Sequence, residues 1–198
     1  NNYVVSITQD KQGFLWFATE EGLNKFDGTR FTTYYKNDLT QDNQGITGNE
    51  LNRVYADTKH PIIWIATQRD GLNAYNYNEQ TFTAYQHNPE NPHSLITNDV
   101  TDIVAAQNTD GLWICTYYRG IEYLDITSGQ FTHYNKSTVP SLPCDQTWTV
   151  LDGGDGNLYI GHVGSGFSIF SPKDKSVKNF RNEAGNPMSL PGNDVFCI

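Results

Sequence analysis

A sequence repeat with a period of 46 to 49 residues runs through this 198-residue chain and limits how it can fold. In each of four segments an aromatic residue is followed by a glycine, and both landmarks keep this spacing. The aromatic positions are Trp16, Trp64, Trp113 and Tyr159, and the glycines are Gly22, Gly71, Gly120 and Gly166. We call these eight residues the repeat anchors. A period of this length is typical of propellers and other arrays of repeated units.

Every repeat contains four short runs of β-branched and aromatic residues, bounded by Gly, Asp or Asn. In the first repeat these runs are Val4–Gln9, Leu15–Ala18, Leu23–Phe26 and Phe31–Tyr35. Such runs between turn residues predict strands, and no segment has an apolar period of helical type. Four antiparallel strands per repeat predict the blades of a β-propeller. The repeated aromatic residue is then expected to be largely buried between adjacent blades.

The repeat boundaries predict a single all-β domain, a partial β-propeller of about four four-stranded antiparallel blades. We expect blades at residues 1–47, 48–97, 98–143 and 144–192, and the start of a fifth at 193–198. The chain is therefore expected to be a piece of a larger propeller, with seven blades. Four blades would leave the first and last sheets uncovered, which predicts a dimer or larger assembly. In such an assembly, residues 193–198 would form a strand that is free to pair with the sheet edge of another chain.

Composition and charge exclude several classes of function. Thirteen Lys and Arg against 22 Asp and Glu give a net charge of −9, with no basic cluster, which disfavours nucleic-acid binding. No apolar run approaches the roughly 18 to 20 residues that span a bilayer. Membrane attachment is therefore expected only through parts of a parent protein outside this sequence.

The cysteines and histidines suggest no metal or cofactor site. The cysteines lack CxxC spacing, and the first of them takes the place of Ala18 and Ala66 in the repeat, which predicts a buried thiol. The histidines lack metal-ligand spacing and are expected at the surface or in turns. We expect no metal and no cofactor. The residues concerned are Cys115, Cys144, Cys197, His60, His87, His93, His133 and His162.

No catalytic motif is present, and we expect no catalytic residue in this chain. It lacks the GxSxG elbow, the P-loop and a GxGxxG after a strand. Asp10, Gly13 and Trp16 nearly match a sialidase Asp-box, but the five arginines are scattered over different repeat positions. A propeller carbohydrate-active enzyme or lyase, and a pure protein-interaction scaffold, remain the alternatives to a ligand-binding domain.

The motif around the first anchor resembles the two-component regulator propeller repeat. Ile7, Asp10, Gly13, Leu15, Trp16, Thr19, Gly22, Leu23 and Phe26 match that pattern, and later repeats match in part. The fourth repeat departs most, with Tyr159 for Trp and His162 for Thr. Long connections with Asn-Pro-x-Ser-Leu are similar to those in sensors of Bacteroidetes hybrid two-component systems. The resemblance implies a periplasmic input domain that binds glycan-derived oligosaccharides and signals as a homodimer to a histidine kinase outside this chain.

In a four-stranded blade, the loop between the second and third strands lies on the same face as the connection to the next blade. These connections are long and varied here, and variable loops on one face of a repeat scaffold are where binding usually occurs. The connections between blades are expected at residues 37–50, 88–98, 137–146 and 181–193.

On this face we expect a ligand site at Tyr117, Tyr118 and Arg119, because sugars bind flat aromatic rings and planar donors. Gln68, Arg69 and Asp70 occupy the equivalent loop one repeat earlier and could add polar contacts. One of the two tyrosines could instead pack between blades. Trp148 is a further candidate, although its expected place on an inner strand also suits a core residue.

Overall fold

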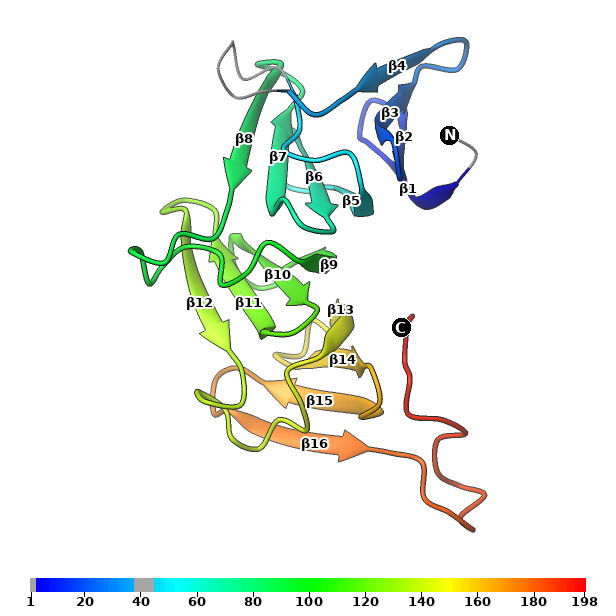
Figure 1. The fold of residues 1–198 in the computed structure, drawn as a ribbon, viewed down its shortest axis with the longest axis vertical. Coiled ribbons are helices and arrows are strands. Elements are labelled where there is room, and N and C mark those ends of the chain that lie inside the picture. Colours follow the sequence, from blue (N-terminus) through cyan, green and yellow to red (C-terminus); the bar gives the residue numbers. More distant parts are fainter. Residues whose placement is uncertain (1–2, 38–44) are drawn as a thin grey trace. The chain divides into compact units, whose positions relative to one another are not determined.

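The computed structural model describes residues 3–37 and 45–198, and its regular secondary structure is entirely β (Figure 1). Sixteen strands form four antiparallel sheets in which sequence neighbours pair. Their bounds are β1 Val4–Gln9, β2 Leu15–Thr19, β3 Gly22–Phe26, β4 Phe31–Tyr34, β5 Leu51–Ala56, β6 Ile62–Thr67, β7 Leu72–Asn76, β8 Thr81–Tyr85, β9 Val100–Ala105, β10 Gly111–Thr116, β11 Gly120–Asp125, β12 Gln130–Tyr134, β13 Thr147–Asp152, β14 Leu158–His162, β15 Phe167–Ser171 and β16 Ser176–Phe180. The prediction of four-stranded antiparallel blades is confirmed.

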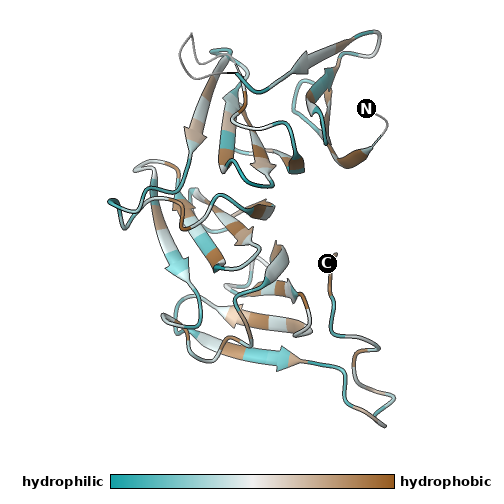
Figure 2. Cartoon of the chain, in the orientation of Figure 1, coloured by the Kyte–Doolittle hydropathy of each residue, from teal (hydrophilic) through white to brown (hydrophobic). Residues whose placement is uncertain are grey.

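The chain divides into two compact units, Asn1–Ile103 and Val104–Ile198, with the boundary inside β9. In the described residues no helix is long and apolar enough to cross a bilayer. Hydrophobic and hydrophilic residues alternate along many strands, as expected for sheets with two different faces (Figure 2).

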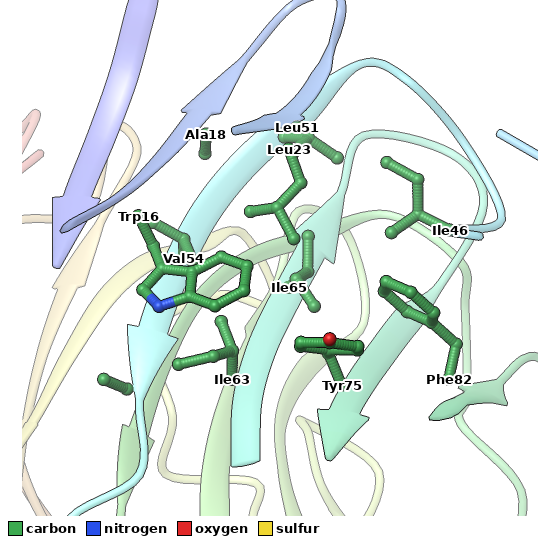
Figure 3. Close-up of a cluster of buried hydrophobic side chains, with 11 residues drawn as sticks. Trp16, Ala18, Leu23, Ile46, Leu51, Val54, Ile63, Ile65, Tyr75 and Phe82 are labelled. Carbon is green, nitrogen blue, oxygen red and sulfur yellow. The ribbon is translucent and has the colours of Figure 1, made fainter. Parts of the chain in front are cut away.

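The core of the first unit lies between two successive sheets. Trp16 and Leu23 of the β1–β4 sheet pack with Val54, Ile63 and Ile65 of the β5–β8 sheet (Figure 3). All five side chains are at most 2% exposed. Two hydroxyls of β1 also bind β5, since Ser6 Oγ donates to the Val54 carbonyl at 3.3 Å and Thr8 Oγ1 accepts from the Ala56 N–H at 3.3 Å.

In the second unit the β9–β12 sheet packs on the β13–β16 sheet in the same manner. Trp113, Cys115 and Ile121 pack with Ile160 and Phe170, and the last four of these are fully buried. Cys115 therefore occupies the core position that the repeat predicted. Strands β6 and β10 are buried along almost their whole length, on both faces.

The aromatic anchors occupy equivalent places in the four sheets. Their cross-strand partners are Trp16↔Lys25, Trp64↔Ala74, Trp113↔Tyr123 and Tyr159↔Ile169. The three tryptophans are at most 8% exposed, as predicted. Tyr159 is only half-buried, which corrects the expectation of four largely buried anchors.

A buried carboxylate holds the indole in the first two repeats. Trp16 Nε1 donates to Asp10 Oδ2 at 2.7 Å, and Trp64 Nε1 donates to Asp57 Oδ2 at 3.0 Å. Burial alone would raise the pKa of Asp57, but hydrogen bonds from the Trp64 indole and from nearby backbone N–H groups lower it overall. The aspartate therefore stays ionised and fixes the ring.

The glycine anchors join each sheet to the segment that follows it. In every repeat the anchor N–H donates to a backbone carbonyl just after the connection, at 2.8 to 3.0 Å. The side chain of that same Asn or Asp accepts the N–H of the second residue after the fourth strand, at 2.6 to 2.8 Å. The N–H donor and carbonyl acceptor of each bond are Gly22 and Asn49, Gly71 and Asn98, Gly120 and Asp145, and Gly166 and Asn193.

Residues 193–198 repeat this start of a blade without forming a strand. Besides the Asn193 bonds, the Gly164 N–H donates to Asp194 Oδ1 at 2.7 Å, and the Val195 N–H donates to the His162 carbonyl at 3.0 Å. The segment is therefore held by its own β13–β16 sheet. The prediction of a free strand for another chain is wrong, because these bonds fix the segment locally.

The Asn-Pro-x-Ser-Leu connections form the same compact turn twice. Ser94 Oγ accepts the Asn88 N–H at 3.0 Å, and Ser189 Oγ accepts the Glu183 N–H at 2.9 Å. In both copies the motif asparagine, Asn91 or Asn186, caps a backbone N–H two residues later at 3.0 Å. The recurrence of this motif therefore has a structural cause. Residues 38–44 of the first connection lie outside the described residues.

Candidate aromatic ligand site

The loop between β10 and β11 presents the predicted tyrosine pair and arginine on a rigid support. Thr116 Oγ1 donates to the Gly120 carbonyl at 2.8 Å and accepts the Arg119 N–H at 3.2 Å. Gly120 has a φ of +84°, where a side chain would be strained. Within this frame Tyr118 is 54% exposed, Arg119 is exposed and Tyr117 is half-buried.

These tyrosines form one end of a row of four aromatic rings. Tyr117 contacts Tyr118 edge-on, with ring centroids 4.2 Å apart, and contacts Trp148 edge-on at 5.9 Å. Trp148 in turn contacts Phe196 edge-on at 5.3 Å. We call these four residues the aromatic row. Its two end members, Tyr118 and Phe196, are 54% and 56% exposed, so apolar ring surface is open to solvent at both ends.

Trp148 reaches this row because it lies at a β-bulge. The pairing of β13 with β14 shifts between Thr147 and Thr149, which leaves Trp148 as the extra residue. Bulges re-aim a side chain and are common next to binding sites. Thr147 Oγ1 donates to the carbonyls of Thr116 and Gly120 at 2.9 and 2.8 Å, so β13 is clamped to the tyrosine loop. Trp148 is half-buried and contacts the rings on both sides of it in the row.

Phe196 is the member that the sequence reading missed. It follows Asn193 by three residues, as Trp148 follows Asp145 by three, and both leading residues accept the glycine-anchor bond. The repeat register therefore places aromatic rings at one equivalent position in two successive repeats. Aligning the repeats on this Asn or Asp would have shown from sequence that the two positions are equivalent, although not that their rings are in contact.

The second predicted loop belongs to the first unit and is more engaged in structural contacts. Asp70 lies 3.6 Å from Lys36 Nζ, and its carbonyl accepts Thr47 Oγ1 at 2.7 Å. Gln68 is half-buried and uses its N–H to bind the Glu50 carbonyl at 2.9 Å, whereas Arg69 is exposed. No aromatic row accompanies this loop among the described residues, which makes Tyr117–Arg119 the stronger candidate.

One histidine contradicts the expectation of surface or turn positions. His162 is fully buried, and burial lowers its pKa to about 4, against a smaller opposing effect of a hydrogen bond to the Gln146 backbone. Nε2 lies 2.9 Å from Ser168 Oγ, and Nδ1 lies 3.5 Å from Cys144 Sγ. The repeat register explains the burial, since His162 takes the place of the buried Thr19, Thr67 and Thr116.

The aromatic row is suited to binding and contains no acid–base pair. Exposed rings offer flat apolar faces to the C–H face of a sugar ring, and the Arg119 guanidinium offers planar paired donors. Across residues 3–37 and 45–198, no group of three His, Cys, Asp or Glu side chains could hold a metal ion.

Comparisons with known proteins match this architecture. The family model described as two component regulator propeller matches residues 1–21. The extracellular domain of BT3049 from B. thetaiotaomicron, assigned to the hybrid two-component systems, is 68% identical with a TM-score of 0.91. This alignment covers 100% of the chain and 26% of that protein's chain, so the present sequence spans about a quarter of its relative.

Two further matches cover less or are more distant. The extracellular domain of BT4673 from B. thetaiotaomicron has a TM-score of 0.73 over 90% of the chain and 25% of its own, at 21% identity, which shows the shared fold. Histidine kinase P4 of Formosa agariphila is 56% identical over 34 residues, which are 17% of this chain and 2% of that protein. Residues 1–21 therefore match the two-component regulator propeller model, and over its full length the chain is similar to the extracellular domain of a protein assigned to the hybrid two-component systems.

Proposed function

We propose that this chain is part of the sensor domain of a hybrid two-component regulator and that it binds oligosaccharides at the aromatic row. The observation that supports this most is the 68% identity, over the whole chain, to the extracellular domain of BT3049. The domain would lie in the periplasm and pass its signal to a histidine kinase in another part of the parent protein. We propose no catalytic activity for the chain itself.

The chemistry of the row supports a carbohydrate as the ligand. Tyr118 and Phe196 each expose more than half of their surface, although such large apolar side chains are normally covered in a folded domain. Tyr118 would bind a sugar face at little entropic cost, because the hydrogen bonds of Thr116 already fix the backbone of its loop. Arg119, beside Tyr118, would add a bidentate contact to a carboxylate or sulfate on the sugar.

Calorimetry with a panel of short neutral and uronate-containing oligosaccharides tests the proposal. Replacing Tyr118 by Ala removes one stacked ring, worth on the order of 1 kcal/mol, so affinity should fall about five-fold. Arg119→Ala should weaken the binding of uronate-containing ligands more than that of neutral ones. Neither change should lower the melting temperature much, since both side chains are exposed.

Tyr3→Ala is the matched control, because Tyr3 is a comparably exposed tyrosine of the first unit, at 60%. It should leave the affinity unchanged. If Tyr118→Ala and Arg119→Ala both fold and bind oligosaccharides with unchanged affinity, the aromatic row is not the binding site. Release of reducing ends from any member of the panel would overturn the assignment as a binding domain.

A further inference from the structure

The first strand of each sheet begins at an equivalent position of the repeat. Strand β1 begins at Val4, β5 at Leu51, β9 at Val100 and β13 at Thr147. The residue in the fourth repeat is the one that carries a hydroxyl, whereas the other three are aliphatic. Threonine and valine have nearly the same branched shape, so this exchange adds a polar group while it keeps the packing.

In the first unit the aliphatic residue at this position is part of the core. Leu51 is fully buried and belongs to the same cluster as Ala18 and Leu23 of the preceding sheet (Figure 3). Val100 is also fully buried. Thr147 is buried to the same extent, so its hydroxyl is removed from water and needs hydrogen-bond partners within the protein.

The hydroxyl of Thr147 finds these partners on the backbone of the preceding sheet. Its Oγ1 shares its proton between the carbonyls of Thr116 and Gly120, at 2.9 and 2.8 Å, and it accepts the Thr116 N–H at 3.2 Å. Thr116 and Gly120 are the two residues that flank Tyr117–Arg119. One buried side chain therefore holds both ends of the loop that carries the tyrosine pair and the arginine.

The equivalent loop of the first repeat is built without this contribution. There Thr19 Oγ1 donates to the Gly22 carbonyl at 2.9 Å, a bond that the second and third repeats share. The residue that the next sheet places at the position of Thr147 is Leu51, which has no polar side-chain atom. The additional hydrogen bonds are therefore a property of the Tyr117–Arg119 loop and are not required by the repeat itself.

Thr147 also determines where the neighbouring ring lies. Trp148 follows it directly, at the β-bulge, and contacts the Tyr117 ring edge-on at 5.9 Å. The bonds of the Thr147 hydroxyl therefore connect the backbone of the bulge to the backbone of the loop, on the two sides of this ring contact.

We propose that Thr147 is a positioning residue of the aromatic row, whose hydroxyl holds the Tyr117–Arg119 loop in the conformation that binds an oligosaccharide. This inference rests on the proposed function. A loop that is already held in its binding conformation loses less conformational entropy when a ligand arrives. Thr147 is buried and acts through Tyr118 and Arg119, whose side chains are exposed.

Two substitutions separate the hydroxyl of Thr147 from its methyl group. Thr147→Val keeps the branched shape, removes the hydroxyl and reproduces the residue found at Val100. It should weaken the binding of the oligosaccharide panel about five-fold in calorimetry, because the loop is no longer held. Thr147→Ser keeps the hydroxyl and should bind within about two-fold of the wild-type affinity, although the lost methyl group lowers its melting temperature.

Amide hydrogen exchange gives a second readout that needs no ligand. The Arg119 N–H donates to Thr116 Oγ1 within the loop, so it should exchange faster in Thr147→Val and at the wild-type rate in Thr147→Ser. Thr149→Val is the matched control, because Thr149 is a threonine of the same strand that is only 7% exposed. Loss of its hydroxyl should leave the exchange of the Arg119 N–H unchanged.

The two measurements distinguish a failure of this inference from a failure of the proposed function. If the wild-type chain binds no member of the panel, the proposed function is wrong and the inference is wrong with it. If the wild-type chain binds and Tyr118→Ala weakens binding, an unchanged affinity or an unchanged Arg119 exchange in Thr147→Val shows that only the positioning role is wrong.

The control variants decide whether the effect is specific to the hydroxyl. If Thr147→Ser or Thr149→Val accelerates the exchange of the Arg119 N–H as much as Thr147→Val does, the cause is a general loosening of β13, which overturns the positioning role. Circular dichroism verifies that each variant is folded. Thr147→Ala, which also lacks the hydroxyl, replaces Thr147→Val if the valine prevents folding, with the same expected loss of affinity and faster exchange.

Discussion

At the scale of single residues, one substitution in the repeat creates a buried group that titrates. In the first three repeats a threonine precedes the loop between the second and third strands. Its hydroxyl donates to the carbonyl of the glycine anchor, as Thr116 does to Gly120 at 2.8 Å. The fourth repeat places His162 there, fully buried and with a pKa lowered to about 4. The unfolded chain, with an ordinary histidine pKa, binds more protons between about pH 4 and 6.5. Stability must therefore fall as the pH decreases through this window.

His162→Thr, which restores the residue of the other repeats, should remove this pH dependence. Between pH 7 and pH 5 the wild-type chain should lose about 2 kcal/mol more unfolding free energy than the variant, from the difference between the two pKa values. Urea unfolding at both pH values measures it. Equal losses in the two proteins would show that His162 is not the group that titrates.

At the scale of elements, the glycine anchors join the loop between the second and third strands to the start of the next repeat through a backbone hydrogen bond. Gly120 combines a positive φ with a close approach, because a Cβ there would meet the carbonyl oxygen of Tyr134. Gly129, in the following turn, also has a positive φ of 69°, but a Cβ there would meet nothing within 4 Å. Substitutions at Gly120 and Gly129 therefore separate two free-energy costs: that of the strained backbone conformation and that of the steric contact.

Gly129→Ala should therefore cost about 1 kcal/mol of unfolding free energy, the strain of an L-residue in this conformation. Gly120→Ala should cost about 3 kcal/mol, because backbone strain and a clash with backbone add together and also displace the Asp145 bond. Chemical denaturation of the two variants measures the difference. Equal costs would contradict the role of Gly120 in joining the loop to the next segment.

The strands and their order could be predicted from sequence because each depends on local information. Runs such as Leu15–Ala18 lie between turn residues, and the repeat register assigns the four runs of each repeat to one sheet. The aromatic row could be predicted only in part, since the contact of Trp148 with Phe196 depends on a bulge and on how residues 193–198 dock. Tyr159 is half-buried where the three tryptophans are buried, a difference that the repeat pattern alone does not predict.

At the scale of the whole molecule, a scaffold of repeated sheets carries one exposed aromatic surface, the aromatic row. The anchors and the Asn-Pro-x-Ser-Leu turns satisfy backbone hydrogen bonds and hold the sheets, while the aromatic row exposes Tyr118 and Phe196 to solvent. The chain is similar to the extracellular domain of a protein assigned to the hybrid two-component systems, and we propose that these exposed rings bind its ligand. The central claim is that ligand contacts the row and leaves the anchors undisturbed.

The indole N–H signals of the four tryptophans test that claim in a single ¹⁵N–¹H NMR spectrum. Trp16 and Trp64 report the buried anchors, through their bonds to Asp10 and Asp57, and Trp148 reports the row. When the oligosaccharide panel is titrated in, the account predicts that a binding ligand shifts the Trp148 signal while those of Trp16 and Trp64 stay in place. A ligand that binds with the Trp148 signal unmoved, or that moves the anchor signals instead, would contradict it.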